Sequence, residues 1–135
     1  MTNKKKDVMF LNKNSLAIAK MAAAVAEDKK AKDTVILNLN KLTLIADYFV
    51  ITSGDSEPQL KAISNFIMRK LKENKIRLLH YEGKPGTGWI LLDYGDVIVH
   101  IFSREKRNFY DLEYIWQEAK KIRLLKRKET LKEEK

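Results

Sequence analysis

The chain contains no cysteine, and this absence excludes several kinds of site. Without thiols there is no disulfide, no thiolate metal centre and no cysteine nucleophile. Histidine is also scarce, because only His80 and His100 occur and neither lies in a metal-binding motif such as HExxH. The sequence therefore predicts no metal site, and it is compatible with a reducing compartment.

Long apolar runs are absent as well. No stretch approaches the roughly 20 apolar residues that a membrane helix needs. The first 14 residues lack both the apolar core of a signal peptide and the arginine and serine content of a transit peptide. A length of 135 residues suits a single domain, and 44% hydrophobic with 33% charged residues is a globular composition. We expect a cytoplasmic protein with no membrane association.

The positive charge of the chain is concentrated at its two ends. Of the net charge of +9, residues 1–14 contribute +3 and residues 120–135 contribute +5, so residues 15–119 are nearly neutral. We expect a basic N-terminal extension over 1–14, a folded domain over 15–119 and a basic, helical C-terminal tail over 120–135. Basic ends attract phosphate without reading sequence. They are either solubilising segments or contacts to nearby RNA.

The hydrophobic pattern predicts the element order α-β-β-α-β-β-β-α. Two strands before the second helix and three after it favour an α/β fold with a mixed five-stranded sheet and flanking helices. The first predicted helix follows a cap at Asn14 or Ser15, and the second follows a cap at Ser56. The third begins near Glu105 and runs into the basic tail. The predicted strands cover residues 35–39, 48–52, 77–82, 89–92 and 97–102.

No set of residues assembles into a recognisable catalytic motif. The turn Ser53-Gly54-Asp55-Ser56 precedes a helix and could bind an anion, but Ser56 with Gln59 is explained equally well as a helix cap. The Asp-x-Asp pair that a nucleotidyl-transferring enzyme needs is missing. Asp93 and Asp96 are typical of a tight turn rather than of a Mg²⁺ site. We predict no catalytic residue, and a structural role for His100.

The hairpin that begins at Trp89 is the strongest candidate for a binding surface. Strand alternation places Trp89, Leu91 and Asp93 on one face. If this face is exposed, it offers an aromatic anchor, an apolar neighbour and a charge for a basic partner. If it is covered, the Trp89 ring packs under a helix and Asp93 caps the turn. Trp116, at helical spacing from Phe109 and Leu112, is predicted to face the core.

The order of several motifs resembles the ribosomal silencing factor family, also called Iojap-related. The resemblance covers residues 15–119, and its most specific part is the block from Trp89 to Phe102 followed by Tyr-Asp-Leu-Glu-x-x-Trp. The matching residues are Asp47-Tyr48-Phe49-Val50-Ile51, Ser53-Gly54, Glu82-Gly83, Gly88 to Phe102 without a break, Arg107, and Tyr110-Asp111-Leu112-Glu113 with Trp116.

The resemblance implies a non-catalytic bacterial factor that uses no cofactor. Members bind the large ribosomal subunit through its protein fourteen, block joining of the small subunit and repress translation when nutrients are scarce. They are often homodimers when free. The implied fold is nucleotidyltransferase-like without the active site. Carried over to this chain, the resemblance assigns the partner contact to Trp89, Leu91, Asp93 and Tyr94, with Glu82 nearby.

Two other functions remain open from the residues alone. The basic termini could make the chain a general RNA-binding protein, and its RNA binding would then fall steeply with salt. Alternatively, the chain could be a nucleotidyltransferase relic with residual activity, and it would then bind nucleotide in the presence of Mg²⁺.

Overall fold

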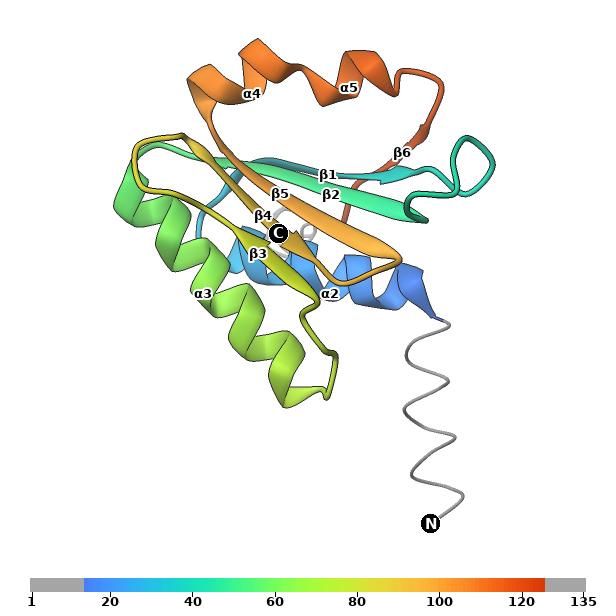
Figure 1. Cartoon of the computed structure of the whole chain (residues 1–135), viewed down its shortest axis with the longest axis horizontal. Coiled ribbons are helices and arrows are strands. Elements are labelled where there is room, and N and C mark those ends of the chain that lie inside the picture. Colours follow the sequence, from blue (N-terminus) through green and yellow to red (C-terminus); the bar gives the residue numbers. More distant parts are fainter. Residues whose placement is uncertain (1–13, 126–135) are drawn as a thin grey trace, which may run out of the picture.

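The computed structural model describes residues 14–125, which form a β-sheet with helices on both faces (Figure 1). No helix in this range is long and apolar enough to cross a membrane. In chain order the elements are α2 (Ser15–Asp28), β1 (Lys32–Asn38), β2 (Tyr48–Gly54), α3 (Glu57–Glu73), β3 (His80–Glu82), β4 (Trp89–Asp93), β5 (Val97–Ser103), α4 (Arg104–Tyr110), α5 (Leu112–Ile115) and β6 (Lys120–Ile122).

The sheet is mixed, as predicted, but it has six strands rather than five. Its order is β3-β4-β5-β2-β1-β6. Strands β2 and β5 run parallel, whereas the other neighbouring pairs are antiparallel. The kinship to nucleotidyltransferases stays a prediction.

The sixth strand corrects the prediction of a helical tail over 120–135. Lys120–Ile122 pairs with β1 in antiparallel register, with Ile122 opposite Ile36 and Lys120 opposite Asn38. The charged sequence hid this strand, because only Ile122 of its three residues is apolar. An edge strand needs little apolar surface, since one side of it has no neighbour. The remaining tail, 126–135, and the N-terminal extension up to residue 13 lie outside the described residues.

Helices α2 and α3 close one face of the sheet, and both begin at the caps that the sequence predicts. The Asn14 side chain accepts a hydrogen bond from the Ala17 N–H at 3.2 Å, and the Ser56 Oγ accepts one from the Gln59 N–H at 3.2 Å. The small residues of α2 let it approach the sheet closely. The helix-side core joins both helices to the inner side chains of the strands; it includes Ile18, Ala22, Val50, Ile63, Ile67, Leu71, Leu92 and Val99.

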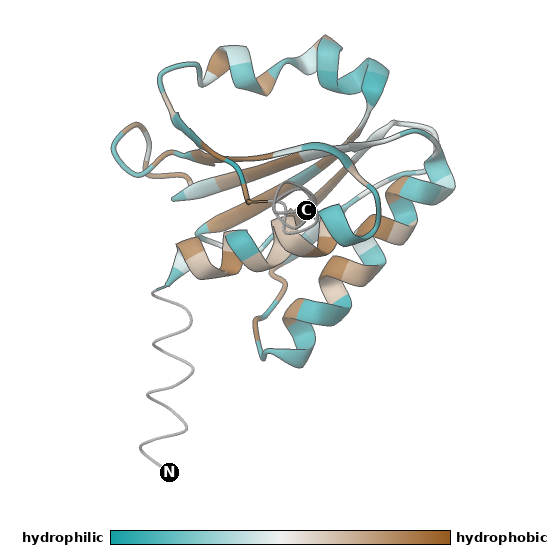
Figure 2. Ribbon diagram, turned by 180° about the vertical axis from the view of Figure 1, so that it is seen from behind, coloured by the Kyte–Doolittle hydropathy of each residue, from teal (hydrophilic) through white to brown (hydrophobic). Residues whose placement is uncertain are grey.

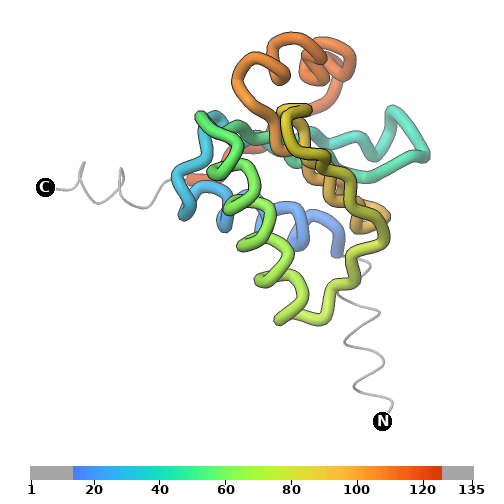
Figure 3. The backbone as a smooth tube through the Cα atoms, turned by 60° about the vertical axis from the view of Figure 1, so that its left-hand side comes forward, coloured from blue at the N-terminus to red at the C-terminus, as the bar shows by residue number. Residues whose placement is uncertain are grey.

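Helices α4 and α5 lie over the other face of the sheet (Figures 1 and 3). The sequence predicts one continuous helix here, but the structure breaks it at Asp111, whose φ of 46° is left-handed. Phe109, in the last turn before the break, is 73% exposed instead of facing the core, and α4 has no buried residue. Trp116 does pack against a second core, which includes Leu37, Phe49, Ile51 and Phe102, and its ring lies edge to face with that of Phe49.

Two glycines with positive φ shape the β4–β5 hairpin, one in its turn and one just before its first strand. Gly95 adopts a φ of 91° in the turn between the strands, a conformation that side chains disfavour. Gly88 has a φ of 71°, and a Cβ there would lie 2.7 Å from the Ser103 Oγ. The Ser103 N–H also donates to the Gly88 carbonyl at 2.9 Å. The glycine-rich loop is thereby held against the start of α4, next to Trp89.

Candidate partner-binding face

Four of the five residues that the resemblance assigns to the partner lie on one side of the sheet, opposite α2 and α3. Along β4, the partly exposed Trp89, Leu91 and Asp93 alternate with the buried Ile90 and Leu92, which confirms the predicted alternation. Glu82 on β3 pairs with Leu91, so its side chain points to the same side. We call the surface formed by Glu82, Trp89, Leu91 and Asp93 the β4 face.

The position of the Trp89 ring is fixed by a hydrogen bond to a buried histidine of the neighbouring strand β5. Its indole Nε1–H donates to the Nδ1 of His100 at 3.2 Å. Burial lowers the pKa of His100 to about 3, so the imidazole is neutral and Nδ1 is free to accept. Its Nε2 finds no hydrogen-bond partner within the described part of the chain. The contact supports the structural role predicted for His100, because the histidine orients Trp89.

Helix α4 covers one side of the Trp89 ring. The Tyr110 ring lies 4.6 Å from it, centroid to centroid, and the Phe102 ring lies 5.1 Å away. Trp89 is nevertheless only partly buried, and Tyr110 and Phe109 are exposed beside it. The two alternatives for Trp89 are therefore combined: one side of the ring packs under a helix, and the residue still reaches the surface.

Tyr110 was missed as a candidate although it lies within the motif that carries the family resemblance. Its position at helical spacing does not distinguish it from an ordinary surface tyrosine. Its contact with Trp89 depends on where α4 ends. The helix ends at Asp111, which is left-handed, and the sequence does not indicate this conformation.

The two carboxylates of the β4 face differ in their exposure and in their hydrogen bonds. Asp93 accepts a hydrogen bond from the Gly95 N–H at 2.8 Å, so it caps the turn, as one of the two interpretations predicted. Glu82 is exposed, and its Oε1 lies 3.3 Å from the Nε2 of His80. Both carboxylates flank Leu91, which pairs with Glu82 on β3 and lies two residues before Asp93. The face is therefore apolar at its centre and acidic at one edge.

Tyr94 lies on the other side of the sheet from the β4 face, and its predicted contact with the partner stays a prediction. Its ring packs against the helix-side core rather than with Trp89 and Leu91. Its hydroxyl is buried without a hydrogen-bond partner among the described residues, and burial raises its pKa to about 12. The residue follows Asp93 by one position, so it points to the opposite side of the sheet. We leave Tyr94 out of the β4 face.

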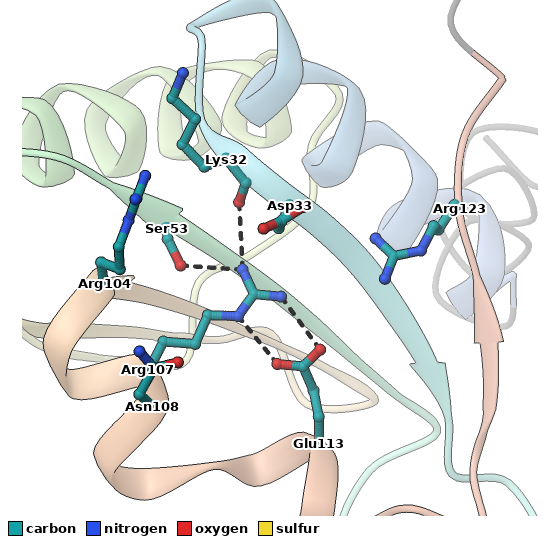
Figure 4. A pocket seen from close by; sticks show the side chains of 8 residues that line it. All are labelled: Lys32, Asp33, Ser53, Arg104, Arg107, Asn108, Glu113 and Arg123. Atoms are coloured by element: carbon teal, nitrogen blue, oxygen red, sulfur yellow. Dashed lines mark hydrogen bonds and ion pairs between the residues drawn. The ribbon is translucent and has the colours of Figure 1, made fainter.

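A partly buried ion pair ties α4 and α5 to the sheet. The Nε and Nη2 of Arg107 lie 3.0 and 3.3 Å from the two carboxylate oxygens of Glu113 (Figure 4). Its Nη1 donates to the Ser53 Oγ at 3.0 Å and to the Lys32 carbonyl at 3.2 Å. Bidentate pairs of this type are geometrically specific. Arg107 thus joins both short helices to β1 and β2, and it holds the segment that carries Tyr110.

The Ser53–Ser56 turn, which could bind an anion or cap a helix according to the sequence, has a structural role. Residues 14–125 contain no group of three metal-ligating side chains. In the Ser53–Ser56 turn, Ser56 caps α3 and Ser53 accepts from Arg107. The capping interpretation of this turn is therefore confirmed.

Comparison with known proteins identifies the family. The family described as ribosomal silencing factor during starvation, RsfS, matches residues 12–135. The chain belongs to the ribosomal silencing factor family. It is 41% identical over 106 residues to ribosomal silencing factor RsfS of Bacillus subtilis, a match covering 78% of this chain and 90% of that protein. It is 40% identical over 111 residues to chloroplastic protein Iojap of Arabidopsis thaliana, covering 82% of this chain and 46% of that protein.

Solved structures of two bacterial proteins share the fold. A crystal structure of a protein from Chromobacterium violaceum superposes with a TM-score of 0.73 at 37% identity and covers 76% of this chain and 85% of that one. One from Bacillus halodurans gives a TM-score of 0.68 at 35% identity, with 78% and 95% covered. The predicted family resemblance is thus confirmed.

Proposed function

We propose that this chain binds the large ribosomal subunit through its protein fourteen and prevents the small subunit from joining, so that translation falls under nutrient limitation. Membership of the silencing factor family supports the ribosomal target. In this proposal the protein acts in the cytoplasm, is not an enzyme and is a homodimer when free. Its basic ends add contacts to nearby ribosomal RNA.

The observation that carries the proposal is the partly exposed aromatic and apolar centre of the β4 face. Trp89 is held by His100 and Tyr110, so it loses little conformational freedom on binding. Leu91 lies beside it on the same strand and stays partly exposed. Rigid, half-buried aromatic residues are enriched among the side chains that dominate binding energy. The face has the character of a protein-docking site.

Charge complementarity favours a basic partner. Glu82 and Asp93 place two carboxylates at the edge of the face, and we expect a ribosomal protein to present arginine or lysine to them. Such rim charges mainly steer association and select the partner. Anti-association requires no chemistry, because a domain fixed near the subunit interface blocks joining by its volume alone.

Co-sedimentation with purified subunits tests this function. We expect the protein to migrate with large subunits and not with small ones, and to reduce the yield of joined ribosomes when both are mixed. Glu82→Lys should weaken this binding, whereas Glu73→Lys should not, because Glu73 lies on α3 across the sheet. Equal migration with both subunits, or equal effects of the two variants, would contradict the proposal.

The general RNA-binding alternative is tested in the same gradients. A chain truncated after Leu125 keeps β6 and loses the last basic residues. If those residues drive binding, the truncated chain should no longer migrate with large subunits, and wild-type binding should fall steeply with salt. Docking through the β4 face predicts that the truncated chain still binds.

A further inference from the structure

A polar hollow of about 460 Å³ lies beside helix α4 (Figure 4). It forms where the ends of β2 and β5 meet the start of β1. Four cationic side chains, Lys32, Arg104, Arg107 and Arg123, line it together with the carboxylates of Asp33 and Glu113. Its volume is in the range of small-molecule sites. None of its lining residues belongs to the β4 face.

The cations of this hollow are not matched by carboxylates. Glu113 is taken up by Arg107, whose other nitrogen donates to Ser53 and to the Lys32 carbonyl. Arg104 reaches Asp55 at 3.5 Å, but both side chains are largely exposed, so the pair is weak. Within residues 14–125, the side chains of Lys32 and Arg123 make no ion pair. The hollow therefore carries an excess of positive charge.

The walls indicate which part of a ligand would be recognised. All the lining residues are charged or polar, so the hollow offers no aromatic ring and no apolar side chain to a ligand. Arginine and lysine are the side chains that bind phosphate, arginine through its fork of N–H donors and lysine as a point charge. The cations also come from separate segments of the chain: β1, α4 and the residue after β6.

We propose that the hollow binds a small anion that carries a diphosphate group. Lys32, Arg104 and Arg123 contact the phosphate oxygens, while Arg107 stays engaged with Glu113 and fixes the floor. Asp33 also lines the hollow and opposes the anion. This carboxylate gives the proposal a test of opposite sign, because its neutralisation should strengthen binding.

The test is calorimetric titration of the full chain with inorganic pyrophosphate at low ionic strength. Lys32→Gln with Arg123→Gln removes two positive charges without breaking an ion pair among residues 14–125. We expect pyrophosphate binding to weaken about tenfold, the loss of two attractive contacts. Lys61→Gln with Lys72→Gln removes the same charge from the exposed side of α3, and this pair should change the affinity by less than about twofold.

Asp33→Asn should raise the affinity for pyrophosphate several-fold, and asparagine tolerates the left-handed φ of 49° at this position. Glu73→Gln, at the far end of α3, is the matched control and should leave the affinity unchanged. The proposal would be overturned if the wild type does not bind pyrophosphate or if Asp33→Asn does not raise the affinity. It would also be overturned if the double variant of Lys32 and Arg123 and the control double variant on α3 change the affinity equally.

A short RNA duplex is the second probe. If the duplex binds through Lys32 and Arg123 while pyrophosphate does not bind, the hollow contacts an RNA backbone, and the proposal of a small diphosphate ligand is wrong. If pyrophosphate binding alone depends on the two residues, the proposal stands.

Discussion

The two faces of the sheet are built from the same strands but are covered to different extents. The face under α2 and α3 is closed and apolar, and its strand side chains, among them Leu92 and Val99, are fully buried. The opposite face is only partly covered, because α4 and α5 are short and Leu91 stays accessible. Figure 2 shows the apolar strands between these layers. Both faces carry a buried core, but the core of the second face is smaller and borders accessible strand residues. The proposed docking site lies on this more open face.

The largest expected effect comes from the closed face. Leu92→Ala removes a fully buried side chain from the helix-side core and should lower the free energy of unfolding by about 2–5 kcal/mol. Chemical denaturation measures this loss. Ribosome binding per folded molecule should be unchanged, because Leu92 does not belong to the β4 face. A variant that folds stably but no longer binds would contradict the division between the faces.

Arg107→Ala should have the next largest effect, and on both properties. The side chains of Arg107 and Glu113 are only 11% and 22% exposed, and removing Arg107 leaves Glu113 without its cation. We expect a loss of stability of about 2–4 kcal/mol. Partner binding should also weaken, because α4 no longer holds Tyr110 against Trp89. Arg104→Ala, which removes an exposed pair, is the control and should cost less than about 1 kcal/mol.

Trp89→Ala should mainly affect binding. Removal of this anchor is expected to cost about 2 kcal/mol of affinity for the large subunit, roughly thirtyfold. Trp89→Phe retains the contact with Tyr110 and should recover part of it. The measurement is a titration of labelled protein with large subunits. Wild-type affinity in a folded Trp89→Ala variant would remove Trp89 from the interface.

Acidification should destabilise the protein through His100. Its pKa is lowered to about 3 in the fold, against about 6.5 when unfolded. Between these two pH values, protons therefore bind the unfolded chain in preference to the folded one. The contribution of His100 to the free energy of unfolding is complete above about pH 6.5 and is lost as the pH falls. We expect this residue alone to lower the free energy of unfolding by about 1 kcal/mol from pH 7.5 to pH 5.5. Chemical denaturation at the two pH values measures this drop. In a His100→Gln variant the drop should be smaller by about 1 kcal/mol than in the wild type.

Much of the fold could be predicted from local signals. The caps at Asn14 and Ser56, the alternation around Leu91 and the glycine turn at Gly95 each depend on residues close in sequence. The third strand was predicted over 77–82 but covers His80–Glu82 alone, since apolar Leu78 and Leu79 are no guide to where pairing starts.

What the sequence did not reveal depends on contacts between distant residues. Strand β6 exists because β1 offers it an open edge, not because its own residues favour a strand. The break at Asp111 is linked to Arg107 and Glu113, which are six residues apart and would not share a side of a continuous helix. Tyr110 ends α4 just before that break, and Glu113, which lines the polar hollow, follows it.

The most direct test of the account compares Leu91→Ala with Met68→Ala for binding to isolated protein fourteen of the large subunit. Leu91 lies at the centre of the β4 face, and Met68 is a partly buried residue of α3 across the sheet. We predict that Leu91→Ala weakens the complex by about 1 kcal/mol, roughly fivefold, while Met68→Ala binds like the wild type. Equal affinities for both variants and the wild type would contradict the claim that this chain docks through the β4 face.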